Sequence, residues 1–181
     1  MLDRDLVKIL KSGGVVVMPT DTIYGVVGSA LKKRTVERIY RLRKRNPIKP
    51  FIILISSPRD LVRFGIRPDV RVKIFLNTIW SFGSAQDNPG PVSVVLPCPE
   101  SKFRYLHRGT KTLAFRVPKP SGLRALLSHT GPLVAPSANI EGEPPAKNVG
   151  EAFRYFNTKV DVYVKGVAKR RVPSLLVEIK R

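Results

Sequence analysis

The sequence has a single cysteine, Cys98, and no long apolar run. One cysteine excludes an internal disulfide and a metal site built from several cysteines, and it fits a reducing compartment. No stretch reaches the roughly 18 apolar residues that a membrane-spanning helix needs. The N-terminal stretch carries charges within its short apolar pattern, unlike a secretory signal. We therefore expect a cytoplasmic protein with no membrane association, in which Cys98 is a core or loop thiol.

Acidic residues are also scarce. The chain has 13 Asp and Glu residues against 33 Lys and Arg residues, which gives a net charge of +20. Such an excess attracts polyanions, so RNA, DNA, nucleotides or an anionic surface are candidate partners. A basic source proteome or proximity to the ribosome would give the same composition. The acids are scattered, and neither His107 nor His129 has a metal-ligand spacing. We expect both histidines to be structural or solvent-facing, and no dedicated metal site.

Apolar segments of helical and strand character alternate along the whole chain, which is 43% hydrophobic. Alternation of this kind predicts one α/β or α+β domain over residues 1–181, built on a mixed sheet flanked by helices. Proline and glycine mark most of the element ends. The patterns predict helices over 3–11, 34–45, 57–65, 68–80, 121–131 and 148–156, and strands over 15–18, 51–56, 92–97, 112–118, 132–139, 160–166 and 173–180.

Two segments follow predicted strands and carry short polar side chains. PTDTIYG (19–25) offers two threonine hydroxyls and a carboxylate directly after a buried strand, where α/β sheets bind ligands. A simple turn with a helix cap would look the same. APSANIEGEPP (135–145) places Ser137 and Asn139 on a turn after another strand, which by itself is a weak signal.

The third segment is the basic run 32–49, with nine Lys or Arg residues and one Glu. Within the predicted helix, Thr35 is a possible cap, and Arg38, Arg41 and Arg45 can share one face. Arginine forks near a helix end suit a polyphosphate, since each guanidinium grips two oxygens. A solvated basic face is the alternative.

Together these segments resemble the YrdC family, the threonylcarbamoyl-AMP synthases, over about residues 5–180. The family signature PT(D/E)TxYGLG appears as PTDTIYGVVG (19–28), and its KxR element before a strand appears as RKRNPIKPFIIL (43–54). PGPVSVVLP (89–97), TLAFRVP (112–118), VAPSANIEGEPPAKN (134–148) and SLLVEI (174–179) match four further motifs in the family's order. The resemblance implies a twisted mixed sheet with a basic concave ligand-binding face.

The resemblance also implies a reaction. L-threonine, bicarbonate and ATP, with Mg²⁺ carried by the ATP, would give threonylcarbamoyl-AMP and pyrophosphate. A separate transferase complex would then pass the group to adenosine 37 of tRNAs that read ANN codons. Adenylyl transfer needs positioning and cationic charge around a polyphosphate more than a strong base, which suits a basic chain with few paired acids.

The matching positions imply roles for ten residues. L-threonine would contact Thr22, Arg116, Ala135 and Ser174. ATP would contact Arg45, Lys49, Thr112, Ser137 and Asn139. The catalytic set would be Arg43, Arg45, Ser137 and Asn139, with Arg43 and Lys49 facing phosphates.

Several positions depart from the family pattern. Arg43 replaces a lysine, Asn88 a tryptophan, Pro145 a serine and Leu175 a threonine, and VAKRRVP (167–173) replaces a glycine-rich stretch. These departures support an alternative, a YciO-like RNA-binding relative that has weak or lost synthase activity and binds double-stranded RNA or tRNA through its basic face. A detached carbamoyltransferase module of the kind used in hydrogenase maturation is a third, less favoured reading.

Overall fold

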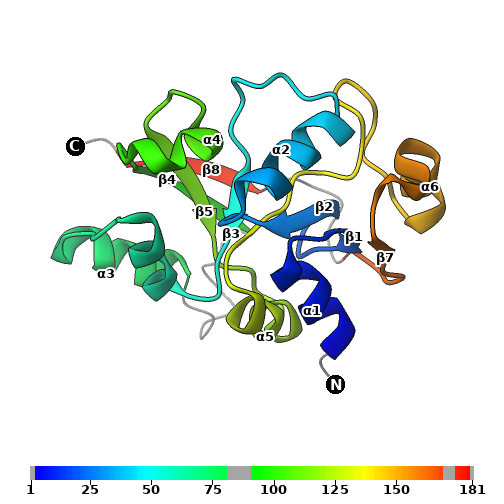
Figure 1. Ribbon diagram of the computed structural model, residues 1–181. Coiled ribbons are helices and arrows are strands. Elements are labelled where there is room, and N and C mark those ends of the chain that lie inside the picture. Colours follow the sequence, from blue (N-terminus) through cyan, green and yellow to red (C-terminus); the bar gives the residue numbers. More distant parts are fainter. Residues whose placement is uncertain (1–2, 81–90, 169–173, 180–181) are drawn as a thin grey trace.

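The computed structural model describes residues 3–80, 91–168 and 174–179. These ranges form a mixed eight-stranded sheet with strand order β7-β1-β2-β6-β3-β5-β4-β8. Figure 1 shows this sheet with helices around it. The strands are β1 (Val15–Pro19), β2 (Tyr24–Ser29), β3 (Ile52–Leu54), β4 (Val92–Pro97), β5 (Thr112–Arg116), β6 (Leu133–Val134), β7 (Val162–Tyr163) and β8 (Leu175–Glu178). The mixed sheet flanked by helices is the predicted fold class, and it is confirmed.

Helices cover both faces of this sheet. The α-helices are α1 (Arg4–Ser12), α2 (Lys33–Leu42), α3 (Val70–Ile79), α4 (Arg104–His107), α5 (Ser121–Thr130) and α6 (Val149–Phe156), and the 3-10 helices are η1 (Pro58–Phe64), η2 (Ser101–Phe103) and η3 (Asn157–Lys159). None of the helices in the described ranges is both long and apolar enough to cross a lipid bilayer.

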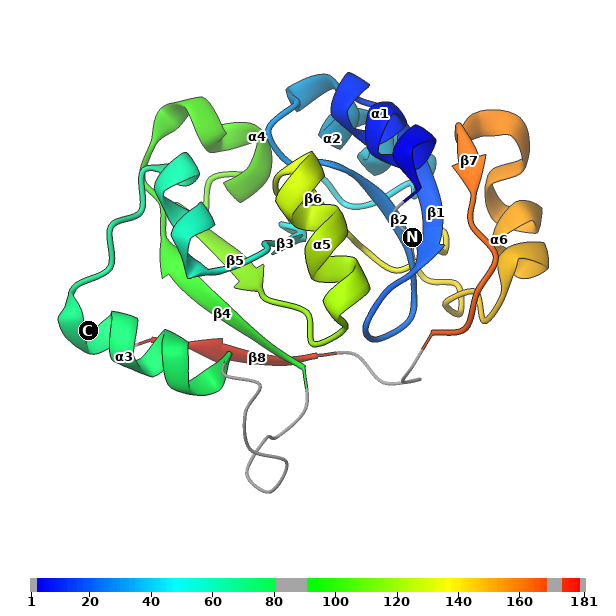
Figure 2. The ribbon, with the colours of Figure 1, turned by 90° about the horizontal axis from the view of Figure 1, so that it is seen from below.

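The sheet separates two hydrophobic clusters, because successive side chains on a strand point to opposite faces. The larger cluster joins Val15 and Val17 of β1 to side chains of α2, α4 and α6. The smaller one joins Val16 and Met18 of β1 to leucines of α1 and α5. Figure 2 shows that α1 and α5 cover only part of the sheet face that carries the smaller cluster. β4 and β8 lie outside the area that these two helices cover.

The predicted helix over 34–45 is α2, but its predicted end and cap are wrong. The helix ends at Leu42, and Lys44 has a φ of 47°, in the left-handed region. Thr35 lies inside the helix and donates its hydroxyl to the carbonyl of Gly13 at 2.8 Å, so it ties α2 to the end of α1. Arg45 therefore lies beyond the helix and cannot share a helical face with Arg38 and Arg41.

Strand predictions were right about position but not always about length. β3, β6, β7 and β8 are shorter than the segments predicted as strands, and the predicted strand over 132–139 is reduced to two residues in β6. β2 was not predicted as a strand, since two glycines interrupt its apolar pattern. Gly28 is needed there, because a Cβ at this position would lie 2.5 Å from Cγ2 of Thr35 on α2. The segment 57–65 is helical as predicted but forms a 3-10 helix, with Pro58 at its start.

The predictions for Cys98 and the two histidines are confirmed. Cys98 is fully buried within the larger cluster, and burial raises the pKa of its thiol. His107 is buried at the end of α4, where its Nδ1 accepts a hydrogen bond from the Gly109 N–H at 3.1 Å. His129 is exposed at the end of α5.

Candidate functional site: a cationic cavity on the open part of the sheet

A cavity of about 520 Å³ lies on the sheet face that α1 and α5 leave open. Alternate residues of β5, namely Thr112, Ala114 and Arg116, form its floor, while Leu113 and Phe115 between them point into the core. Residues of β3, β4 and β8 extend this floor in register, since Ala114 pairs with Ile52 of β3 and with Val95 of β4.

Eight of the ten residues that the sequence singled out line this one cavity. They come from segments far apart in the chain, and they are Thr22, Arg43, Arg45, Thr112, Arg116, Ala135, Ser137 and Ser174. The other two are not part of the lining, since Lys49 is exposed and Asn139 is buried. Pro145, one of the departures from the family pattern, is part of the lining. Asn88 and residues 169–173 fall outside the described residues.

The PTDT segment and the APSAN segment meet along β2. The Val26 N–H donates to the Pro136 carbonyl at 2.8 Å, and the Ala138 N–H donates to the Tyr24 carbonyl at 2.8 Å. Gly25 permits this approach, because a Cβ there would lie 3.2 Å from the Pro136 carbonyl oxygen. The Thr20 hydroxyl donates to the Ile23 carbonyl at 2.7 Å and shapes the turn that brings Thr22 to the cavity.

Arg116 is the centre of one polar group in the cavity. Its Nη2 donates to Oδ1 of Asp21 at 3.0 Å, and its Nη1 donates to the Ser174 hydroxyl at 2.9 Å and the Ser93 hydroxyl at 3.4 Å. Both charged side chains are almost fully buried, at 4% and 3% exposure. Burial lowers the pKa of Arg116, and the attraction of Asp21 opposes that shift. Nε of Arg116 and Oδ2 of Asp21 have no partner among the described residues.

Arg43 is the centre of a second group, at the end of α2. Its Nε donates to the Asn139 carbonyl at 3.0 Å, and its Nη2 donates to Oδ1 of Asn139 at 2.9 Å and to the Ser137 hydroxyl at 3.1 Å. Burial and the nearby Arg45 lower the pKa of Arg43 to about 10, so it remains a cation at neutral pH. Its buried Nη1 has no hydrogen-bond partner in the described part of the chain.

Asn139 forms hydrogen bonds both with Arg43 and within its own loop. Its amide nitrogen donates to the carbonyls of Ile140 and Glu143, at 2.9 and 2.7 Å. These bonds together with the one from Arg43 engage both ends of the amide. Asn139 therefore contacts the Arg43 guanidinium and does not line the cavity.

Arg45 and Lys49 follow on the loop after α2. The guanidinium of Arg45 lies over the ring of Phe51, 5.3 Å from its centroid, and both residues line the cavity. Lys49 makes an ion pair with Glu141 at 2.9 Å and is more exposed. Of the basic run, Arg38 instead pairs with Asp161 at 2.6 Å, away from the cavity, and Arg41 is exposed.

Ser93, Asp21 and Glu141 contact the candidate residues, and sequence reasoning assigned none of them a role. Ser93 had a signal, since it is the one hydroxyl in the apolar strand VSVVLP and is fully buried. Asp21 stood in a motif that was recognised, but its pairing with Arg116 joins positions 95 residues apart. Glu141 gave no local signal, because its partners Arg45 and Lys49 are more than 90 residues away.

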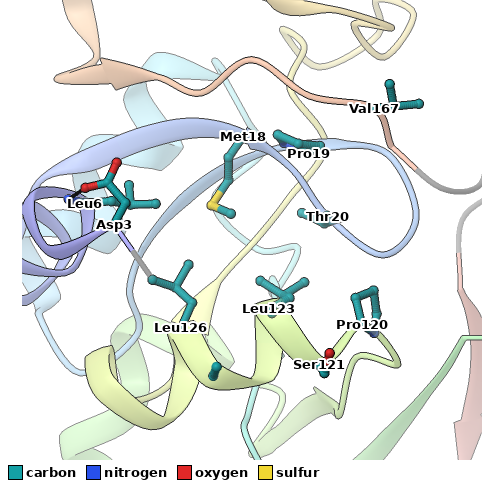
Figure 3. A pocket seen from close by; sticks show the side chains of 12 residues that line it. Asp3, Leu6, Met18, Pro19, Thr20, Pro120, Ser121, Leu123, Leu126 and Val167 are labelled. Atoms are coloured by element: carbon teal, nitrogen blue, oxygen red, sulfur yellow. Dashed lines mark hydrogen bonds between the residues drawn. The ribbon is translucent and has the colours of Figure 1, made fainter. Parts of the chain in front are cut away.

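A second hollow, of about 630 Å³, lies beside the cationic cavity but does not share its chemistry. Pro19 at the end of β1 and Thr20 after it line this hollow, whereas Thr22 and Ile23 of the following loop line the cavity. Figure 3 shows its largely apolar walls, with Leu123 and Leu126 of α5 across from Met18 of β1. Its one carboxylate, Asp3, already caps α1 by accepting from two backbone N–H groups.

The described lining of the cavity holds three arginines, several hydroxyls and no Asp or Glu. Guanidinium groups and hydroxyls bind carboxylates and phosphates, and the apolar floor from β3, β4 and β5 fits the uncharged parts of a ligand. Fold and site together define an α/β domain with a cavity suited to an anionic small molecule.

Comparison with known proteins identifies the family. The Sua5/YciO/YrdC family, described as telomere recombination, matches residues 8–181, and the chain belongs to it. The chain is 33% identical over 158 residues to the threonylcarbamoyl-AMP synthase of Halorhodospira halophila, covering 87% of this chain and 78% of that protein. It is 31% identical to the synthase of Marinobacter nauticus, covering 93% of this chain and 86% of that protein.

Solved structures agree with this assignment. Sua5 of Pyrococcus abyssi, solved in complex with L-threonine, superimposes with a TM-score of 0.83 at 28% identity. The match covers 97% of this chain and 50% of that protein, so the chain spans half the length of this relative. YciO of E. coli superimposes with a TM-score of 0.76 over 98% of this chain and 83% of its own, and at 23% identity it shows the shared fold.

Proposed function

We propose that this chain is a threonylcarbamoyl-AMP synthase, which makes threonylcarbamoyl-AMP and pyrophosphate from L-threonine, bicarbonate and ATP. One observation carries the proposal: eight of the ten residues expected to contact threonine or ATP line the same cavity, although they come from five separate segments. Relatives named threonylcarbamoyl-AMP synthase and the complex of a relative with L-threonine support it.

L-threonine would bind at the Arg116 group. The guanidinium is the natural partner of the amino-acid carboxylate, and its Nε hydrogen has no partner in the described chain. Asp21 and Ser174 hold the guanidinium plane in place through the bonds given above. Thr22 and Ala135 lie on the same cavity wall, where a hydroxyl and a backbone group can contact the rest of the amino acid.

ATP would bind at the Arg43 and Arg45 group, with Ser137 and Thr112 as hydroxyl contacts. Arg43 and Arg45 would face the phosphates with Lys49 at the outer edge, and Asn139 would hold Arg43 in place. The described residues contain no group of three His, Cys, Asp or Glu side chains placed for a metal ion. We expect Mg²⁺ to enter as part of MgATP, held by the phosphate oxygens.

The reaction then needs positioning more than acid–base chemistry. The nitrogen of the threonine amine attacks the carbon of bicarbonate, and water leaves. The N-carboxylate formed in this way is itself a nucleophile. One of its oxygens attacks the α-phosphorus, the bond from that phosphorus to the bridging oxygen breaks, and pyrophosphate leaves. Fixed arginines next to the phosphates stabilise the charge that develops, which is the main contribution that a protein makes to such transfers.

The product would be handed to a transferase complex that modifies adenosine 37 of tRNAs reading ANN codons. The +20 charge of the chain favours contact with tRNA during this step. The same charge favours the second candidate function, an RNA-binding relative without synthase activity, and Pro145 in the cavity wall supports this alternative because it offers no hydroxyl to a nucleotide.

The two functions are separated by measuring pyrophosphate release from MgATP with and without L-threonine and with and without bicarbonate. If the chain is a synthase, pyrophosphate release should require both L-threonine and bicarbonate. Arg45→Ala should strongly reduce this release. A protein that binds RNA in a salt-dependent manner but releases no pyrophosphate would be the RNA-binding relative.

A further inference from the structure

Glu141 places a negative charge directly beside the cations expected to bind ATP. Its Oε1 accepts from Nζ of Lys49 at 2.9 Å and lies 3.9 Å from Nη1 of Arg45. Its side chain is 24% exposed, so solvent screens these contacts only in part. No other carboxylate of the described chain forms an ion pair with Arg45 or Lys49.

The surrounding loop keeps the Glu141 side chain in this position. Its own N–H donates to the carbonyl of Arg43 at 2.8 Å, which anchors its backbone to the end of α2. Its Oε2 accepts the backbone N–H of Asn46. That bond, followed by the one from Lys49, lowers the pKa of Glu141, so the group is a carboxylate at neutral pH.

We propose that Glu141 is a built-in competitor of the ATP phosphates, which weakens nucleotide binding by occupying Lys49 and neutralising Arg45 until a polyphosphate displaces it. This inference rests on the proposed function, because it takes Arg45 and Lys49 as phosphate contacts. In this role Glu141 sets the affinity of the protein for ATP, although it does not itself line the cavity.

The direction of the effect follows from how Arg45 is held. Besides Glu141, Arg45 stacks over Phe51, and its Nε donates to the Lys49 carbonyl at 3.3 Å. These contacts keep the guanidinium at the cavity wall when the charge of Glu141 is removed. A glutamine at position 141 retains one oxygen that can accept from the Asn46 N–H, so the loop keeps that bond. The negative charge and the oxygen that accepts from Lys49 are lost, which frees Lys49 as well as Arg45.

The test compares Glu141→Gln with Glu37→Gln. Glu37 is the control because it also forms an ion pair, with Lys33 of α2 at 3.9 Å, but neither Glu37 nor Lys33 lines the cavity. Equilibrium binding of ATP, inorganic tripolyphosphate and L-threonine is measured for both variants and the unaltered protein. Removal of a competing exposed charge should tighten binding of ATP and of tripolyphosphate about two- to fivefold in Glu141→Gln. Glu37→Gln should leave both affinities unchanged, and neither variant should alter L-threonine binding.

The possible results separate the inference from the proposed function. Unchanged or weaker ATP binding in Glu141→Gln, with ATP still bound by the unaltered protein, overturns the competitor role and leaves the synthase proposal standing. Equal tightening in Glu37→Gln also overturns it, since the effect would then come from overall charge. If the unaltered protein binds neither ATP nor tripolyphosphate, the proposed ATP site is wrong and the inference is wrong with it.

Discussion

The buried pair of Asp21 and Arg116 predicts a large and asymmetric response to substitution. Replacing Arg116 by methionine removes the cation but keeps an unbranched side chain that fills part of its space. The Asp21 carboxylate, whose side chain is 3% exposed, then loses its ionic partner. Removing one partner of a buried pair costs about 3–5 kcal/mol, because the remaining charge is left uncompensated in a medium of low polarity. Unfolding free energies of natural domains are about 5–15 kcal/mol, so Arg116→Met should be severely destabilised.

The double variant Asp21→Asn, Arg116→Met removes both charges together. Replacing both partners of a buried ion pair by well-packed hydrophobic residues is often close to neutral, and asparagine at position 21 keeps the size of the aspartate while it removes the charge. Ser93 and Ser174 keep a partner in either variant, because their hydroxyls are 2.9 Å apart and bond to each other. The double variant should therefore recover most of the stability that Arg116→Met loses.

Urea and thermal unfolding of the three proteins measure this difference. For a chain of this length, 3–5 kcal/mol corresponds to a fall in Tm of about 6–20 °C. L-threonine binding should be lost in both variants, while the double variant should retain ATP binding, because it is folded and the Arg43 group is intact. Equal stability of the single and double variants would refute the reasoning, since it would show that Asp21 is not left uncompensated.

Two further predictions concern the framework of the site. Gly28→Ala should cost about 1–3 kcal/mol of unfolding free energy, because the new Cβ meets Cγ2 of Thr35, and adding Thr35→Ser, which removes that methyl group, should recover part of the loss in denaturant unfolding. Burial raises the pKa of Asp161, but the bonds from Arg38 and from the Val15 N–H outweigh it and lower the pKa overall. The stability from Asp161 is therefore present above its unfolded pKa of about 4 and lost as pH falls through the lower folded value. Since the group is partly exposed, Asp161→Asn should cost less than about 1 kcal/mol at pH 7, and the difference from the unaltered protein should vanish towards pH 2.

Much of the fold could be predicted because the local signals agree with the final structure. Helices α3 and α6 lie within the predicted ranges 68–80 and 148–156, and each begins after an Asp or Asn whose side chain accepts a backbone N–H. β2 could not be predicted in this way, since its glycines serve contacts with α2 and with the Pro136 segment. Local patterns fail at such positions because the reason for the residue lies in a distant part of the chain.

The candidate site shows the same division. The motif matches predicted ten site residues, and eight of them line one cavity in the structure. Composition and periodicity alone would have placed Arg38, Arg41 and Arg45 together on a helix, and that prediction was wrong because α2 ends before Arg45. The pairing of Asp21 with Arg116 depends on the register of the sheet, and no pattern in the sequence encodes this register locally.

Direct detection of the product tests the central claim most simply. The protein is incubated with MgATP, L-threonine and ¹³C-labelled bicarbonate, and the adenylates are analysed by mass spectrometry. We predict a threonylcarbamoyl-AMP peak that carries the label and disappears when L-threonine is omitted or when Arg45 is replaced by alanine. Pyrophosphate release without a labelled adenylate, or no turnover by a folded protein that still binds ATP, would contradict it.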